Sequence, residues 1–420
     1  MARIGHSWEG KYNGPMSNAS GFCPTGFSEE RLARIPRFLE GQVAAGALPG
    51  ALTLIWRDGR VAHQSLVGQT DLGRGLTMRE DAIFRLYSMT KPVTAVALLM
   101  LLEEGRIALD DPAAKFIPSF AALKLVDGAT PRRAITVLDL LRHTAGFTYG
   151  FHNRTPIDAA YRAQKIAEMD TEGGLTAMIG QLEKLPLEYS PGDAWIYSVA
   201  TDVVGRLIEV VSGQDYAEFV RQRILTPLKM NDTDFLVPEA KRERFIPCYV
   251  LKDGRLDLFD DSEGSKFLAA PALVSGGGGL VGTASDYLRF CRMLLSKGEL
   301  DGVRLLSPKT VALMTANHLP DGKEIADLSP AADAFNESGY RGVGFGLGVA
   351  VTLDPARMGI PGTAGEFAWG GMASTAFFVD PKEDMAVIFM TQVIADMARR
   401  VRLRRDLRTL IYGAMTESHA

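Results

Sequence analysis

The sequence predicts an α+β protein, because strand patterns lie near both ends of the chain and helical patterns fill its middle. A hydrophobic run at residues 51–56 is followed by the turn pair Asp58-Gly59 and a second run at 60–67, as in a β-hairpin. Between about residues 109 and 230 the pattern is mostly helical. Further strands are expected at residues 345–353, 367–380 and 385–392.

Three helices are defined well enough to place other features on them. Residues 92–102 are almost entirely apolar and begin with Pro92, which predicts a buried helix that ends near Gly105. A second helix is expected over residues 198–212, with Tyr197 at its start. The chain closes on a third helix, whose apolar face holds Leu403, Leu407, Leu410 and Ile411. Six arginines lie on this last helix, and we interpret them as a solvated face rather than a nucleic-acid patch: residues 399, 400, 402, 404, 405 and 408.

Composition favours an ordinary soluble enzyme. The 420 residues are 46% hydrophobic and carry a net charge of −4, which indicates neither a nucleic-acid partner nor an anionic membrane. The three cysteines are scattered and do not suggest disulfides. No hydrophobic leader follows Met1, so we expect a cytoplasmic protein. No pattern calls for a metal ion or an organic cofactor, and the oligomeric state is not indicated.

The first chemical signal is the pair Ser88 and Lys91 in the string SMTK. Residues three apart on a helix share a face, so Lys91 can reach the Ser88 hydroxyl. A serine hydroxyl becomes a good nucleophile when a neighbouring base takes its proton, and a buried lysine can act as that base. The string alone is weak, since Ser-x-x-Lys should occur about once by chance in such a chain. Its position at the start of the buried helix strengthens it.

Several ordered segments together resemble the penicillin-recognising serine enzymes, and in particular the family VIII carboxylesterases, which are similar to class C β-lactamases. The resemblance covers most of the chain, from about residue 50 to 392. The matching segments are residues 84–92 (FRLYSMTKP), 140–146 (LLRHTAG), 191–193 (PGD), 197–199 (YSV), 277–280 (GGGL) and 369–371 (WGG).

The resemblance implies a β-lactamase/transpeptidase-like fold, with an antiparallel sheet flanked by helices. Residues 1–108 and 250–420 would form one α/β domain and residues 109–249 a mostly helical one, with the active site in the cleft between them. Ser88, Lys91 and Tyr197 would be catalytic. Trp369, Gly370 and Gly371 would lie beside the substrate, and the backbone N–H groups of Ser88 and Met372 would hold the oxyanion.

Two departures from the β-lactamase pattern favour neutral esters as substrates. The chain has Val199 where β-lactamases carry Asn, and Trp369 where they carry a Lys that helps to hold a substrate carboxylate. Trp369 could line the acyl or alcohol pocket or could simply belong to the core. Phe147, Tyr149 and Phe151 are open to the same two interpretations. His143 is expected to be a structural hydrogen bonder.

The expected function is therefore that of a serine carboxylesterase that hydrolyses small, short-chain acyl esters through an acyl-serine intermediate, with weak β-lactam hydrolysis as a side activity. Three alternatives stay open: a β-lactamase or D-amino-acid peptidase, an acyltransferase that uses an alcohol acceptor, and a non-catalytic acyl-serine sensor. The intact Lys91 and Tyr197 make the sensor the least favoured of these.

Overall fold

A computed structural model describes residues 22–23, 25–330 and 341–420. Its centre is an eight-stranded sheet in which every neighbouring pair is antiparallel. Strands from the two ends of the chain meet in the middle of this sheet, where β16 pairs with β3. In order across the sheet the strands are β12 (Val343–Phe345), β13 (Ala350–Thr352), β14 (Phe367–Gly370), β15 (Ala376–Asp380), β16 (Met385–Met390), β3 (Gly50–Arg57), β4 (Arg60–Asp71) and β5 (Leu76–Thr77).

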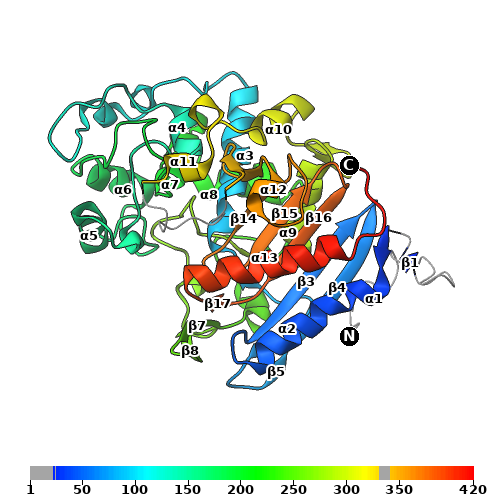
Figure 1. The fold of residues 1–420 in the computed structure, drawn as a ribbon. Coiled ribbons are helices and arrows are strands. Elements are labelled where there is room, and N and C mark those ends of the chain that lie inside the picture. The colour runs from blue at the N-terminus through cyan, green and yellow to red at the C-terminus, as the bar shows by residue number, and fades with distance from the viewer. Residues whose placement is uncertain (1–21, 24, 331–340) are drawn as a thin grey trace.

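Helices cover both faces of the sheet. Side chains alternate between the two faces along each strand, and both faces carry apolar side chains that must be covered. On β3, Leu54 belongs to the larger hydrophobic core and Ile55 to a second core on the opposite face. The second core lies under α1 (Glu29–Leu32), α2 (Arg34–Ala44) and α13 (Met397–Gly413), and Figure 1 shows α13 lying across the strands. On the other face, α9 (Ala284–Leu295) packs against β15, β16 and β3.

The helical region folds around α3 (Thr90–Glu103), whose side chains are buried almost throughout. In this region α7 (Ala200–Ser212) packs against α3, α4 (Val137–Leu141), α6 (Gly174–Leu182) and α8 (Tyr216–Val220). The region also holds α5 (Pro156–Ala163), a π-helical turn at Arg221–Leu225 and 3₁₀ turns at Ala113–Lys115, Pro118–Ala122 and Gly150–His152. The packing of α3 on α7 sets the distance between the segments that carry Ser88 and Tyr197.

Small elements complete the structure. The paired strands are β1 (Phe22–Cys23) with β2 (Phe27–Ser28), β6 (Phe84–Arg85) with β9 (Val281–Gly282), β10 (Glu299–Leu300) with β11 (Val303–Arg304), and β7 (Cys248–Lys252) with both β8 (Arg255–Asp260) and β17 (Val393–Ile394). The short helices are α10 (Pro308–Met314), α11 (Ile325–Leu328) and α12 (Pro355–Met358). Further 3₁₀ turns lie at Tyr87–Met89, Glu239–Arg244, Lys266–Leu268 and Pro320–Gly322.

The predicted fold class is confirmed, and the details need three corrections. The strands expected at 345–353 and 367–380 are each divided by a turn, so they form the hairpins β12–β13 and β14–β15. Tyr197 lies in a loop before α7, which begins at Ala200. The arginines of α13 do not all face solvent, since Arg400 is only 5% exposed. The division into two domains stays a prediction.

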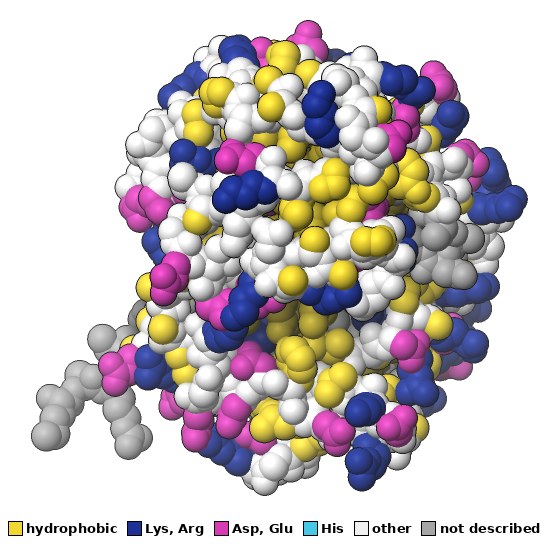
Figure 2. Space-filling view, turned by 90° about the vertical axis from the view of Figure 1, so that its left-hand side faces the viewer, with side chains coloured by type: hydrophobic (Ala, Val, Ile, Leu, Met, Phe, Trp, Pro, Cys, Tyr) yellow, Lys and Arg dark blue, Asp and Glu magenta, His cyan; other side chains and the backbone are white. Residues whose placement is uncertain are grey.

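Surface charge is mixed on the face that Figure 2 shows, where basic and acidic side chains are interspersed among the described residues and hydrophobic side chains appear in hollows between them. Within the part of the chain that the structure describes, no helix combines the length and the apolar character needed to cross a bilayer. Cys248 and Cys291 are free and buried.

Candidate active site

Ser88 lies in the 3₁₀ turn Tyr87–Met89, directly before α3. Its side chain is half-buried, while the helix behind it is buried along most of its length. Tyr87 adopts a left-handed backbone conformation with φ of 45°, which is uncommon for a residue other than glycine and costs conformational energy. Such strained positions persist only where the surrounding structure holds them in place, and they cluster at functional sites.

Lys91 is 1% exposed, and its Nζ lies close to oxygen atoms of Ser88, Tyr149 and Gly277. The Nζ donates to the carbonyl oxygen of Gly277 at 2.7 Å and to the hydroxyl of Tyr149 at 3.0 Å. It also lies 3.5 Å from Ser88 Oγ, at the long end of a hydrogen bond. The i, i+3 spacing therefore places Lys91 as the sequence predicts, and two further groups fix its amine beside the serine.

Tyr197 is brought to the same serine from the helical region. Its hydroxyl donates to Ser88 Oγ at 2.5 Å, and Lys91 Nζ lies 4.5 Å from the centre of its ring. The ring packs edge-on against His143 at 5.0 Å and in a tilted arrangement against Trp369 at 5.5 Å. The carbonyl oxygen of Tyr197 accepts a hydrogen bond from His152 Nε2 at 2.6 Å. Ring contacts and backbone together hold the phenol against Ser88.

His143 packs against this tyrosine and, as expected, forms a hydrogen bond. The histidine is 1% exposed, and its Nδ1 accepts a hydrogen bond from the backbone N–H of Ser198 at 3.3 Å. Burial, together with the charge of Lys91, holds the pKa of His143 well below its usual value. The imidazole is therefore neutral at ordinary pH and is placed to orient Tyr197 rather than to exchange protons with Ser88.

The sequence did not identify the carboxylate that organises this site. Asp202 is fully buried on the first turn of α7, and its Oδ1 accepts from the Ser275 hydroxyl at 2.6 Å and from the Gly277 N–H at 3.0 Å. It thereby fixes the position of Gly277, whose carbonyl oxygen accepts a hydrogen bond from Lys91. Burial raises the pKa of Asp202, although the charge of Lys91 opposes the rise. The spacing of Asp202 from Tyr197 carries no local signal, so only the three-dimensional arrangement identifies its role.

Tyr149 contacts Lys91, which the pattern of aromatic residues in the sequence did not indicate. Besides accepting from Lys91, it stacks on Phe151 with ring centres 4.6 Å apart. Burial, followed by the nearby Asp202 carboxylate, raises the pKa of Tyr149 well above its usual value, so this phenol stays protonated. Phe147 instead packs against Phe120 in the core, which answers the question left open for that residue.

The segment after β14 lies directly against the residues that precede Ser88. A Cβ on Gly371 would be 2.5 Å from the carbonyl oxygen of Leu86 and 2.3 Å from Thr375 Oγ1, so only glycine fits there. Gly371 and Thr375 close the turn between β14 and β15 through a hydrogen bond from N to O of 2.9 Å. Met372 lies within this turn. The glycine therefore allows the turn that holds Met372 to approach the residues before Ser88 closely.

Trp369 is 4% exposed and contacts Phe345 as well as Tyr197, with ring centres 5.3 Å apart for the Phe345 pair. Val199 is completely buried. Trp369 thus packs against the ring of the tyrosine that reaches Ser88, and its contact with substrate stays a prediction.

Comparison with known proteins agrees with this geometry. The family model described as Beta-lactamase matches residues 35–410. This chain belongs to the beta-lactamase family. The resemblance to the penicillin-recognising serine enzymes and their esterase branch is confirmed.

Individual relatives cover nearly the whole chain. A Mycobacterium tuberculosis protein is 35% identical, over 84% of this chain and 88% of its own length. Esterase EstB of Burkholderia gladioli is 31% identical, over 89% of this chain and 94% of its own. A solved structure, "EstCE1, a hydrolase with promiscuous acyltransferase activity", superimposes with a TM-score of 0.77 and 27% identity, over 91% of this chain and 99% of the other. The chain is therefore a serine hydrolase in the broad sense, which includes serine esterases and related acyltransferases.

Proposed function

We propose that this chain is a serine carboxylesterase that hydrolyses short-chain acyl esters through an acyl-serine intermediate. One observation carries the proposal: Tyr197 and Lys91, from different parts of the chain, both place a polar atom within hydrogen-bonding distance of Ser88 Oγ. A nucleophile in direct contact with groups that can exchange its proton is the arrangement that covalent catalysis needs. The esterase name of a 31% identical relative supports the same choice of substrate class.

In the acylation step Ser88 Oγ attacks the ester carbonyl carbon, and the Tyr197–Lys91 pair takes the serine proton. The same proton then passes to the departing alcohol oxygen, so that the bond from carbonyl carbon to alcohol breaks as the acyl-serine forms. Lys91 lies 4.5 Å from the Tyr197 ring, and its positive charge stabilises negative charge on that phenol. Tyr149 and Gly277 keep the Lys91 amine in place during this transfer.

Negative charge on the carbonyl oxygen would be stabilised by the backbone N–H groups of Ser88 and Met372. The close approach of Gly371 to Leu86 places the two segments side by side. In the second step water attacks the acyl-serine, the Tyr197–Lys91 pair takes a proton from the water, and Ser88 recovers its hydroxyl hydrogen as the acid leaves.

Neutral esters are the proposed substrates because the site lacks two groups that β-lactamases use. Val199 offers no amide, and Trp369 offers no positive charge for a carboxylate. β-Lactam or D-amino-acid peptide hydrolysis therefore ranks as a side activity. Acyl transfer to an alcohol is the second candidate function, and it is favoured by the structural similarity to EstCE1, a hydrolase with promiscuous acyltransferase activity. Hydrolysis and transfer share the acyl-serine and differ only in the final acceptor.

The decisive experiment measures p-nitrophenyl butyrate and a chromogenic cephalosporin side by side with wild type, Ser88→Ala and Ser296→Ala. Ser296 is an exposed serine at the end of α9 and serves as the matched control. Ester turnover that disappears only in Ser88→Ala, with little cephalosporin cleavage, supports the proposal. Full ester turnover by Ser88→Ala would overturn it.

Two further measurements separate the alternatives. Product analysis with an added alcohol shows whether the acyl group passes to the alcohol rather than to water. Mass spectrometry after a single addition of substrate shows whether the acyl-serine persists, as it would in a sensor that never deacylates. Rapid return to the unmodified mass excludes the sensor.

A further inference from the structure

The turn that carries the proposed oxyanion donor is held from behind by the C-terminal helix. The Nη2 of Arg404, on α13, donates to the carbonyl oxygen of Gly371 at 3.0 Å. That carbonyl and the N–H of Met372 belong to one planar peptide group. A single hydrogen bond from Arg404 therefore acts on the same peptide unit whose N–H faces the reaction in the mechanism above.

The same guanidinium also holds the other end of the turn. Arg404 Nη2 donates to the Thr375 carbonyl oxygen at 2.7 Å, and that oxygen accepts the N–H of Gly371 as well. One helical turn earlier, Arg400 Nη1 lies 3.5 Å from the Met372 carbonyl oxygen. These three carbonyl groups all lie within the short connection between β14 and β15.

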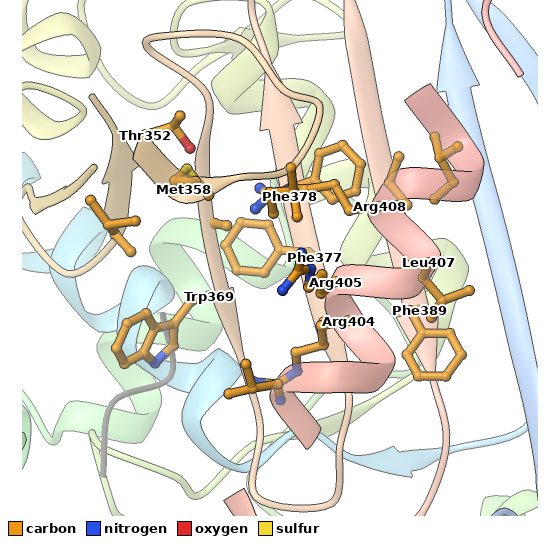
Figure 3. A pocket seen from close by; sticks show the side chains of 18 of the residues that line it. Thr352, Met358, Trp369, Phe377, Phe378, Phe389, Arg404, Arg405, Leu407 and Arg408 are labelled. Atoms are coloured by element: carbon orange, nitrogen blue, oxygen red, sulfur yellow. The ribbon is translucent and has the colours of Figure 1, made fainter. Parts of the chain in front are cut away.

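The space beside the turn is adapted to this guanidinium. A Cβ on Gly370 would lie 2.4 Å from Arg404 Cζ, so the side chain at position 370 must be a hydrogen atom for Arg404 to reach the turn. Figure 3 shows Arg404, Arg405 and Arg408 projecting from α13 toward the strands, with Trp369 nearby. The cavity at this place is lined mainly by hydrophobic side chains of the sheet and of α13, which limits screening of the charge by water.

We propose that Arg404 is a positioning residue for the oxyanion site: it orients and polarises the Gly371–Met372 peptide from the face of the sheet opposite Ser88. This inference rests on the proposed function, since it assumes that the Met372 N–H binds the oxyanion. It also explains why residue 370, beside Gly371, is a glycine. Arg404 itself does not touch the substrate.

The expected effect follows from how a peptide group responds to a charged donor. A hydrogen bond at the carbonyl oxygen withdraws electrons and makes the N–H of the same group a stronger donor, an effect of about 10–30% per bond in a chain of hydrogen bonds. Removing a whole oxyanion donor costs roughly 100- to 1,000-fold in kcat, so a weakened and less well oriented donor should cost less, about 10- to 50-fold.

The test compares Arg404→Ala with Arg402→Ala, a control on the same helix whose side chain is 78% exposed. We expect Arg404→Ala to lower kcat for p-nitrophenyl butyrate by roughly tenfold or more at nearly unchanged KM, and to weaken inhibition by n-butylboronic acid by a similar factor. The boronate adduct of Ser88 carries its negative charge where the oxyanion forms, so its affinity reports the donor directly. Millimolar guanidinium should restore part of the activity of Arg404→Ala.

A second variant tests the same contact while Arg404 is retained. Gly370→Ala should displace the guanidinium and lower kcat and boronate affinity in the same way, and the double variant should lose little beyond Arg404→Ala. The proposal is overturned if Arg404→Ala and Gly370→Ala bind the boronate as tightly as Arg402→Ala does. If Ser88→Ala keeps its esterase activity, the proposed function fails instead, so the two failures are distinguishable.

Discussion

The hydroxyl of Tyr197 lies 2.5 Å from Ser88 Oγ, although the two residues are 109 positions apart in the chain. Tyr149, in contrast, contacts Lys91. Two tyrosines thus share one site with different contacts. The tyrosine that contacts the nucleophile should take part in proton transfer, and the other should only hold the lysine.

Replacing each tyrosine by phenylalanine tests this difference. Tyr197→Phe should lower kcat by about 100-fold or more, since it removes a proton-transfer partner. Tyr149→Phe should cost about tenfold, because Lys91 loses one acceptor and keeps Gly277. Rapid-quench measurement of acyl-serine formation should show the larger defect in Tyr197→Phe. Equal defects in the two variants, or a larger one in Tyr149→Phe, would contradict the assigned roles.

Gly371 leads to a second prediction, because its hydrogen atom faces the chain just before Ser88. Gly371→Ala should move the turn away from Leu86 and lower kcat by roughly 100-fold, as the loss of an oxyanion donor does. The matched control is Gly180→Ala, because a Cβ on Gly180 in α6 meets nothing within 4 Å. That control should keep full activity and gain stability, since alanine is the better helix former by about 1 kcal/mol. Wild-type turnover in Gly371→Ala would show that the close approach has no catalytic use.

Much of this architecture is predictable from local sequence patterns. The turn pair Asp58-Gly59 marks the β3–β4 hairpin, and both residues take positive φ angles of 51° and 79°. The apolar run after Pro92 defines α3, and the spacing of Ser88 and Lys91 places the amine beside the hydroxyl. These features depend on contacts within a few residues, which the sequence records directly.

The remaining features depend on contacts between distant segments. Asp202, Ser275 and Gly277 meet only because α7 packs beside α3, so no spacing identifies them. The arginines of α13 have the composition of a solvated face, yet Arg400 and Arg404 turn inward to backbone carbonyl groups. Backbone acceptors have no sequence signature, and this is why the interpretation of that face was wrong for these two residues.

Trp369 provides a test of substrate preference. Trp369→Lys supplies the cation that β-lactamases carry there and should raise the ratio of cephalosporin to ester turnover. Ester turnover itself should fall, because the ring contacts with Tyr197 and Phe345 are lost. Trp369→Met is the control, since it removes the ring without adding charge. The substrate-carboxylate argument fails if the ratio rises equally in both variants or in neither.

Stability of the segment that carries His143 should depend on pH through Asp139. This carboxylate is fully buried; burial alone would raise its pKa, but hydrogen bonds from Arg133 and Thr136 more than offset this and lower the pKa to about 2. Because the pKa is depressed in the folded state, the stabilisation is complete at pH values well above 3.8, the pKa of a free aspartate, and is lost as the pH falls toward 2.

The pH-dependent part of this stabilisation amounts to about 2 kcal/mol. Asp139→Asn should therefore lower the free energy of unfolding by at least this amount at pH 7, and the gap to wild type should shrink by about 1 kcal/mol at pH 3. Urea unfolding at the two pH values measures the gap, with Asp321→Asn, whose side chain is 83% exposed, as the control. A gap that is the same at both pH values would show that the ionised Asp139 does not stabilise the fold.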